Sequence, residues 1–252
     1  MDNLPVLLGD EARNIDLEVT EKLGRVRVLE CVATRVADTL HYHLGIVPYT
    51  TPLLFVAGKG NNGANALAVA RILAFRGWSN ITIMPLVQPS EHNLRPNIVE
   101  QLQLLSDFGL ADNIHPLDWE CIQKFQRGVI IDGILGTGIA SPPRGVALQA
   151  IQAINAASTS LVGGYNNKVQ VLAIDIPSGL NHVTGEAPGE CVGATWTINL
   201  HMLKSGQLTS QAKPYIGELW SAETALGFTS FPGLLKNFTS FYKDGPIQKV
   251  QI

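Results

Sequence analysis

The chain has 252 residues, of which 46% are hydrophobic and only 15% are charged. This composition argues against a disordered, coiled-coil or collagen-like protein and predicts a globular domain with a large core. The formal net charge of −3 provides no excess of positive charge, so we do not expect a nucleic-acid partner.

Membrane and export signals are missing from the sequence pattern. No apolar run reaches the roughly 18 residues that a membrane helix needs, and the N-terminal stretch lacks the basic region of a secretory signal. The cysteines Cys31, Cys121 and Cys191 are odd in number and widely spaced, which is typical of reduced, mostly buried thiols. These features predict a cytoplasmic protein without membrane contact.

Helical spacing of apolar residues alternates with short continuous apolar runs along the chain. In chain order, the pattern predicts helices over 11–23 and 25–44, a strand over 53–57, a helix over 64–76, a strand over 81–86, a helix over 97–108, a strand over 129–132, a helix over 147–157, a strand over 169–174, and weaker strands over 194–198 and 217–222. Strands that alternate with helices in this way form parallel sheets.

We therefore expect an α/β protein with a three-layer Rossmann-like fold, in which helices cover both faces of a central, mostly parallel sheet. The sequence shows no internal repeat and no long linker, so we expect a single domain over 1–252. Its aromatic-rich tail, 228–252, would pack on the domain or on a partner subunit.

Ligands bind outside the carboxyl ends of strands in such sheets, so the segments after the strands are candidate sites. The first, Gly58–Gly63, has the GxGxxG spacing of a dinucleotide-binding loop. The next strand, however, ends without the acidic residue that binds ribose in that motif. An alternative interpretation is a tight turn with an asparagine helix cap. The side-chain oxygens of Asn61 and Asn62 suit a sugar, a polar ring or a hard cation.

Two further apolar strands end in aspartates, Asp132 and Asp175, and Ser178 follows the second. Burying a carboxylate costs free energy unless it is paired or hydrogen-bonded, which suggests a functional role. An alternative interpretation is that these residues do no more than cap the turns that follow the strands. Because the three loops leave parallel strands at one edge of the sheet, we expect their polar residues, Asn61 and Asn62 included, to line one pocket. Oxygen donors suit a hard cation, and a carboxylate suits acid/base chemistry.

The histidines leave alternatives open. His41 and His43 form an HxH pair at a helix end, which is more typical of a solvated or capping pair than of a metal site. His201 and Lys204 follow the strand predicted at 194–198 and either face the pocket or lie on the surface.

These loops resemble the YjeF N-terminal domain family, whose best-known members are NAD(P)H-hydrate epimerases. The family's GxGNNGGDG loop appears as GKGNNGANA at 58–66, its D-A-x-x-G-T-G motif with a following proline appears at 132–142, and its D-I-P-S-G motif is unchanged at 175–179. The resemblance covers roughly residues 10–227. It implies a three-layer α/β fold, often dimeric, and an isomerase that interconverts the R and S epimers of hydrated NAD(P)H.

The resemblance also assigns roles by position. It implies that Asp175 is the acid/base group, that Asn62, Asp132 and Ser178 hold a potassium ion, and that no redox cofactor is used. Substrate would contact Asp175 and residues of the first two loops, namely Asn61, Asn62, Gly63, Ala64, Asn65, Gly136, Thr137, Gly138, Ile139, Ala140, Ser141 and Pro142.

The chain departs from the family pattern beside this site. Ala64, Asn65 and Ala66 replace the final Gly-Asp-Gly of the glycine loop, so an acid becomes an amide and two glycines gain methyl groups. The family's A-P-K-x-G stretch keeps Lys204 but loses its proline. Three hypotheses follow: an epimerase, a redeployed isomerase or cyclase that uses Asp175 on another small molecule, or a non-catalytic dimeric interaction module.

Overall fold

The computed structural model describes residues 4–9, 11–87, 94–138, 141–159, 169–224 and 232–252. A seven-stranded sheet with the order β3-β2-β4-β5-β6-β8-β9 forms its centre. The strands are β2 (Leu53–Ala57), β3 (Ile81–Pro85), β4 (Val129–Gly133), β5 (Gln170–Ile174), β6 (Trp196–Leu200), β8 (Glu218–Ala222) and β9 (Ile247–Val250).

All neighbouring strands of this sheet run parallel except β8 and β9, which are antiparallel. The predicted mostly parallel sheet is therefore confirmed. The sequence pattern did not predict β9, a short strand that is only partly buried at the sheet edge.

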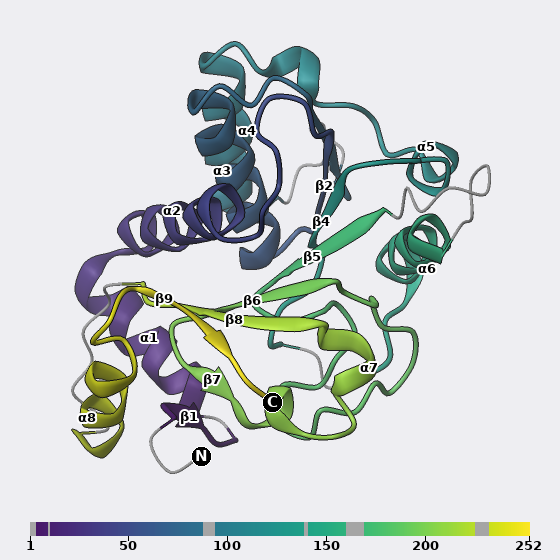
Figure 1. Ribbon diagram of the computed structural model, residues 1–252. Helices are drawn as coiled ribbons and strands as arrows, with labels where there is room; N and C mark the ends of the chain where they lie inside the picture. Colours follow the sequence, from purple (N-terminus) through teal and green to yellow (C-terminus); the bar gives the residue numbers. More distant parts are fainter. Residues whose placement is uncertain (1–3, 10, 88–93, 139–140, 160–168, 225–231) are drawn as a thin grey trace.

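Helices cover both faces of the sheet, which confirms the three-layer arrangement (Figure 1). On one face lie α2 (Arg25–Tyr42), α3 (Asn61–Phe75) and α4 (Pro96–Asp107), and on the other α5 (Trp119–Gln123) and α6 (Gly145–Thr159). Successive strand residues point to opposite faces. Phe55 accordingly joins the core beneath α2 and α3, whereas Val56 joins the core beneath α6.

Smaller elements complete the described chain. They are α1 (Glu11–Leu23), α7 (Lys213–Ile216), α8 (Pro232–Phe241), the 3-10 helices η1 (Ala111–Asn113) and η2 (Ser205–Leu208), and a two-stranded parallel sheet of β1 (Val6–Leu7) and β7 (Leu203–Lys204). α8 lies beside α1 (Figure 1), and Phe238 packs with Ile15 and Val19 in one apolar cluster. The residues 232–252 of the tail therefore pack on α1 and extend the sheet beside β8, where β9 forms the edge.

Two local expectations need correction. The helix predicted from residue 64 begins at Asn61, because the asparagines of the glycine loop form its first turn and Ala64 N donates to Gly60 O (3.2 Å). Gly60, not an asparagine, is the cap residue.

Cys121 is exposed on the short α5, so the expectation of a buried thiol is wrong there, whereas Cys191 is buried. No helix within the described residues has the length and apolarity to cross a membrane.

Candidate functional site

The strand order reverses between β2 and β4. From β2 the chain passes through α3 to β3 on one side, and β4 then pairs with β2 on the other. In open α/β sheets, ligands bind at the carboxyl ends of the strands at such a switch point. The glycine loop follows β2 and Asp132 lies at the end of β4, so both lie at this position.

The first two loops touch through their backbones. Gly58 N donates to Gly133 O (3.0 Å), and a Cβ atom on Gly58 would lie 1.9 Å from Ile134 O. A Cβ atom on Gly63 would lie 1.7 Å from Gly58 O. Only glycine allows backbone to approach backbone so closely. Gly58 and Gly63 are therefore required by the packing of the loops, independently of any ligand.

Asn62, Asp132 and Ser178 form one buried hydrogen-bonded cluster. Ser178 Oγ donates to Asp132 Oδ1 (2.6 Å), and Ser178 N donates to Asp132 Oδ2 (2.8 Å). Asn62 Nδ2 donates to the carbonyl oxygens of Leu135 (2.8 Å) and Ile174 (3.0 Å). Since Leu135 N also donates to Ser178 Oγ (2.9 Å), the structure brings residues from all three loops together.

Burial governs the charge of this cluster. Asp132 has no exposed surface, and burial raises the pKa of its carboxyl to about 6, although hydrogen bonds from Ser178 and from Ile134 N oppose this rise. The carboxylate thus carries its charge at neutral pH only at an energetic cost, which donors or a nearby cation can offset.

Asp175 follows β5 with a positive φ of 68°, a conformation uncommon for residues other than glycine. Its Oδ1 accepts hydrogen bonds from Lys204 Nζ and from Leu200 N (3.3 Å), and its backbone oxygen accepts one from Gln207 Nε2 (2.8 Å). The side chains of Asp175 and Lys204 are 15% and 7% exposed, so this is an ion pair largely shielded from water. No partner of Asp175 Oδ2 occurs within the described residues.

Other charged and titratable groups face this ion pair. Asp16 on α1 is exposed, yet the protein atoms on one side of its carboxyl raise its pKa, and the charge of Asp175 adds to this effect while Lys204 and Arg25 oppose it. Burial lowers the pKa of His201 to about 4, and His201 Nδ1 lies 2.9 Å from Thr224 Oγ1. The surface alternative for His201 and Lys204 is therefore wrong, since His201 is half-buried and Lys204 is buried.

The residues expected to contact substrate lie in different environments. Asn61 is exposed and its Oδ1 accepts a hydrogen bond from Asn97 Nδ2 (3.1 Å), whereas Ala64 has no exposed surface. Gly63 is buried and Asn65 half-buried. Gly136 and Thr137 are half-buried, Gly138, Ser141 and Pro142 are exposed, and Ile139 and Ala140 lie outside the described residues.

Sequence reasoning missed Asn199 and Gln207, the further partners of Lys204 and Asp175. Lys204 Nζ donates to Asn199 Oδ1 (2.8 Å) and to Leu200 O (2.9 Å). Asn199 could have been noticed in the sequence, because it is a polar residue within the apolar strand β6. The two histidines of the HxH pair contact different residues: His41 Nδ1 accepts a hydrogen bond from Trp78 Nε1 (2.9 Å), and the ring of His43 packs against that of Trp220.

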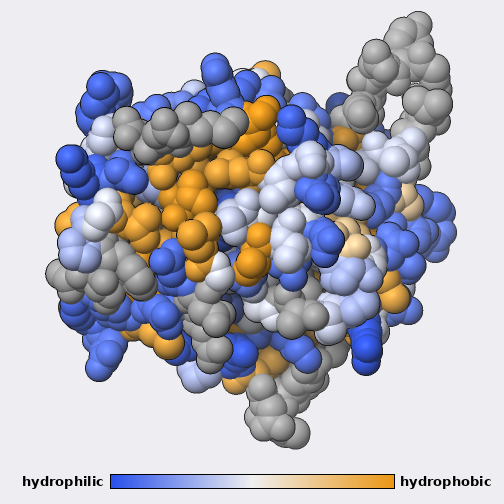
Figure 2. Space-filling view, turned by 90° about the horizontal axis from the view of Figure 1, so that it is seen from below, coloured by the Kyte–Doolittle hydropathy of each residue, from blue (hydrophilic) through white to orange (hydrophobic). Residues whose placement is uncertain are grey.

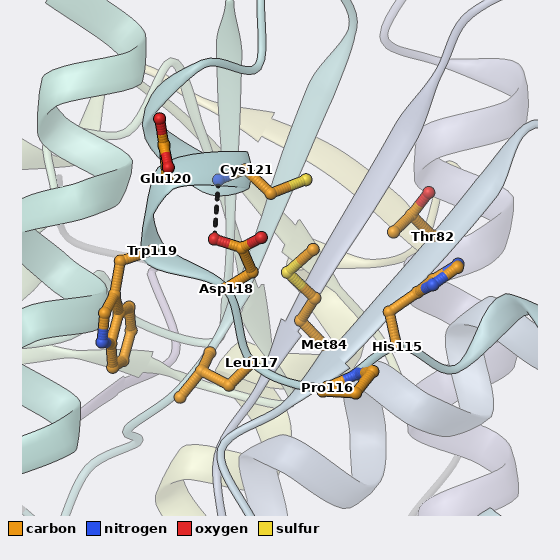
Figure 3. Close-up of a pocket in the computed structure, with 9 residues that line it drawn as sticks. All are labelled: Thr82, Met84, His115, Pro116, Leu117, Asp118, Trp119, Glu120 and Cys121. Atoms are coloured by element: carbon orange, nitrogen blue, oxygen red, sulfur yellow. Dashed lines mark hydrogen bonds between the residues drawn. The ribbon is translucent and has the colours of Figure 1, made fainter.

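A surface cavity of about 750 Å³ lies elsewhere, between β3 and α5. Figure 3 shows Met84 between Asp118 and Cys121 on one side and Thr82 and His115 on the other. Asp118 accepts a hydrogen bond from Cys121 N (3.1 Å) and so caps α5. None of the predicted site residues that the structure describes lines this cavity.

Comparison with known proteins adds a family to this geometry. Residues 26–206 match the model of the family described as YjeF-related protein N-terminus. The chain is 29% identical over 220 residues to the NAD(P)H-hydrate epimerase of Limosilactobacillus reuteri, a match that covers 85% of this chain and 92% of that enzyme. It is 32% identical over 197 residues to the NAD(P)H-hydrate epimerase of Limosilactobacillus fermentum, a match that covers 76% of this chain and 81% of that enzyme.

Longer relatives and a solved structure are also similar. The chain is 36% identical over 211 residues to the bifunctional NAD(P)H-hydrate repair enzyme Nnr of Hyperthermus butylicus, a match that covers 80% of this chain but only 36% of that enzyme. The crystal structure of yeast ynu0, YNL200c, has the same fold, with a TM-score of 0.72 at 17% identity over 97% of this chain and 99% of the yeast chain.

Proposed function

We propose that this chain, which belongs to the YjeF-related protein N-terminus family, is an NAD(P)H-hydrate epimerase in which Asp175 is the catalytic acid/base group. The names of the relatives from Limosilactobacillus support the activity. The observation that carries the proposal for this chain is the largely shielded Asp175–Lys204 ion pair beside the Asn62, Asp132 and Ser178 cluster.

The geometry suits proton transfer at Asp175. To invert a carbon that bears a hydroxyl group, a bond to that carbon must break and re-form on the other face, while a proton leaves the substrate and returns. Lys204 and Leu200 N hold Oδ1, so the carboxylate presents Oδ2 to substrate in a fixed orientation.

The residues of the buried cluster fit a potassium ion by the chemistry of their donors. Asn62, Asp132 and Ser178 offer an amide, a carboxylate and a hydroxyl oxygen, and the carbonyls of Leu135 and Ile174 face the Asn62 amide. All are hard oxygen ligands of the kind that hard cations prefer. When bound there, the cation would supply positive charge that offsets the burial of Asp132.

A coupled assay tests the epimerase proposal. The purified chain is mixed with a dehydratase that consumes one epimer of hydrated NADH or NADPH, and consumption of the other epimer is followed. We expect clear acceleration over the spontaneous rate, and a loss of about 10²- to 10⁴-fold for Asp175→Asn. Asp112→Asn, at an exposed aspartate of η1, is the matched control. A wild-type rate equal to the spontaneous rate would refute the proposal.

Cation binding is tested separately by stability. A ligand that binds only the folded state raises the melting temperature, so the wild type should melt higher in KCl than in LiCl at equal ionic strength. Ser178→Ala should remove this difference. Equal melting temperatures in the two salts would refute the potassium site while leaving the epimerase proposal standing.

A second candidate function is an isomerase or cyclase acting on another small molecule. Asn65 favours it, because a half-buried amide stands where the family has a carboxylate. The two functions differ in ligand binding. Calorimetric titration with NAD(P)H or its hydrates should show binding for the epimerase and none for the redeployed enzyme, while Asp175→Asn abolishes turnover in both cases.

A homodimer, which the family resemblance implies, is also a proposal. Figure 2 views the end of the molecule that carries β1, α1 and α8 and shows hydrophobic residues gathered on part of this face. Leu8, directly after β1, Leu17 of α1 and Leu235 of α8 are 61%, 60% and 36% exposed. Light scattering coupled to gel filtration should give twice the 27.2 kDa mass of the chain, and the monomer mass would contradict the dimer.

A further inference from the structure

A series of hydrogen bonds connects Lys204 with the segment beyond the residues that the family model matches. Lys204 Nζ donates to Asn199 Oδ1 (2.8 Å), and Asn199 Nδ2 donates to Ser221 Oγ (2.8 Å). Ser221 Oγ lies 2.7 Å from the hydroxyl oxygen of Tyr242, and that hydroxyl donates to His201 O (2.9 Å). We call these five residues the Lys204–Tyr242 network.

The donors of this network all point in one direction. An ammonium group can only donate, so Lys204 fixes the Asn199 amide with its oxygen toward Nζ and its nitrogen toward Ser221. The hydrogen of the Tyr242 hydroxyl is used by His201 O, and therefore Ser221 donates to Tyr242. In such a series each hydrogen bond polarises the next, and loss of one member weakens the others.

Burial makes the network sensitive to any missing member. Asn199 and Ser221 have no exposed surface, and Lys204 is 5% exposed. A buried polar group that loses its partner incurs a desolvation cost. The pKa of the Tyr242 hydroxyl is raised, mainly by burial, so it stays protonated and remains a donor at neutral pH.

Tyr242 also holds the turn that leads to Lys204. His201 lies between β6 and β7 with a positive φ of 68°, and Tyr242 binds its backbone oxygen. The preceding residue, Leu200, contacts both members of the ion pair, since its N–H donates to Asp175 and its carbonyl accepts from Lys204. Tyr242 therefore supports the ion pair by two routes, one through side chains and one through this turn.

We propose that Tyr242 is a positioning residue of the active site, which holds Lys204 against Asp175 through the Lys204–Tyr242 network. The inference rests on the proposed function, in which Asp175 is the acid/base group. It goes beyond that function because it makes the segment after α8, outside residues 26–206, a part of the site.

The variant Tyr242→Phe tests this role with little change in packing. The phenylalanine ring keeps the contacts of the tyrosine ring with Phe238 and Phe241, whose ring centroids each lie 4.8 Å away. Because small displacements of a catalytic group reduce the rate strongly, we expect kcat to fall about tenfold while KM stays within about twofold. Thr239→Val is the matched control, since among the described residues the Thr239 hydroxyl bonds only to carbonyls of α8 itself; it should keep the wild-type kcat.

A double-mutant cycle asks whether Tyr242 acts through the network. Ser221→Ala interrupts the same series one step closer to Lys204. If both residues act on Lys204 together, the double variant should lose little more kcat than the more affected single variant. Losses that multiply, or a Tyr242→Phe kcat within twofold of wild type, would overturn the inference.

A spectroscopic measurement separates this inference from the proposed function. The ammonium signal of Lys204 is observed by NMR in protein with ¹⁵N-labelled lysine and assigned with Lys204→Arg. It should shift or broaden in Tyr242→Phe and stay unchanged in Thr239→Val. If the wild type shows no epimerase turnover but the signal shifts, the proposed function fails and the positioning role stands. An unchanged signal overturns the positioning role at any level of activity.

Discussion

A Cβ atom on Gly133 would lie 2.5 Å from the Cβ atom of Ala66, so the end of β4 and the first turns of α3 leave room for only one methyl group between them. The family motifs place the residues the other way round, with glycine at the position of Ala66 and alanine at that of Gly133. In this chain the methyl group is on the helix, whereas the family motifs have it on the strand. Because Ala66 has no exposed surface, this departure from the family pattern concerns core packing.

The exchange predicts a rescue. Gly133→Ala should lower the free energy of unfolding by about 2 kcal/mol, because the new methyl group overpacks the contact with Ala66. Ala66→Gly should cost about 1 kcal/mol through helix propensity. The double variant, which restores the family's arrangement, should be more stable than Gly133→Ala alone. Urea denaturation followed by circular dichroism measures all three, and simple additivity of the two changes would contradict the exchange.

The glycine loop should tolerate alanine at one position and not at another. Gly63→Ala should lower the free energy of unfolding by more than about 3 kcal/mol or prevent folding, because the Cβ atom of the alanine would lie 1.7 Å from Gly58 O. Gly60→Ala should cost less than about 1 kcal/mol, since a Cβ there meets nothing within 4 Å and only the helix cap changes. Melting temperatures of the two variants test the difference, and equal losses would show that the loop is not held by this backbone contact.

His201 predicts a pH dependence of stability. Its pKa is lowered to about 4 in the folded protein, chiefly by burial and further by Lys204, while Asp175 opposes the shift. In the unfolded chain this histidine binds its proton near pH 6.5. The contribution of neutral His201 to the free energy of unfolding is therefore complete above that pH, and about 3 kcal/mol of it is lost as the pH falls toward 4.

The variant His201→Asn isolates this effect. Asparagine tolerates the positive φ of the position and does not titrate, so the difference in unfolding free energy between wild type and variant should shrink as the pH is lowered from 7 to 4. Denaturation curves at several pH values measure it. A difference that stays constant over this range would contradict the assigned pKa.

The Asp175–Lys204 ion pair should be far more sensitive to the loss of one partner than a surface pair. Lys204→Met leaves the carboxylate of Asp175 without the ammonium group that pairs with it, and should lower the free energy of unfolding by about 3 kcal/mol. Lys249→Met is the control, because Lys249 and Glu218 form a pair whose side chains are 52% and 49% exposed, and should cost less than about 1 kcal/mol. Chemical denaturation compares the two, and similar costs would contradict the shielding of the ion pair.

Most strands of the sheet could be predicted from the sequence, because they are buried on both faces and therefore appear as continuous apolar runs. The strand at 53–57 agrees with β2 for this reason. β9 has no such pattern: two consecutive polar residues, Gln248 and Lys249, lie between its apolar ends, and the strand is recognised through its pairing with β8. The start of α3 was misplaced because Gly60 carries no side chain to mark the cap.

The candidate site divides along similar lines. Asn62, Asp132 and Ser178 stand at strand ends in recognisable motifs, so the sequence could point to them. Their roles with substrate and cation stay predictions. Ser221 and Tyr242 carry no local signal, since their contacts depend on the neighbouring positions of β6 and β8 in the sheet and on the way α8 returns to it. Such contacts follow from strand order, which a single sequence does not reveal.

The network that ends at Tyr242 has a consequence for biosynthesis. Translation runs toward the C-terminus, and nascent chains begin to fold before synthesis is finished. Asp175 and Lys204 leave the ribosome well before the tyrosine whose hydroxyl supports them. A polypeptide interrupted between residues 222 and 242 would carry the whole region that identifies the family, together with β8, and still lack that hydroxyl. Premature termination in this interval should therefore yield a protein with the family's motifs and a poorly ordered lysine.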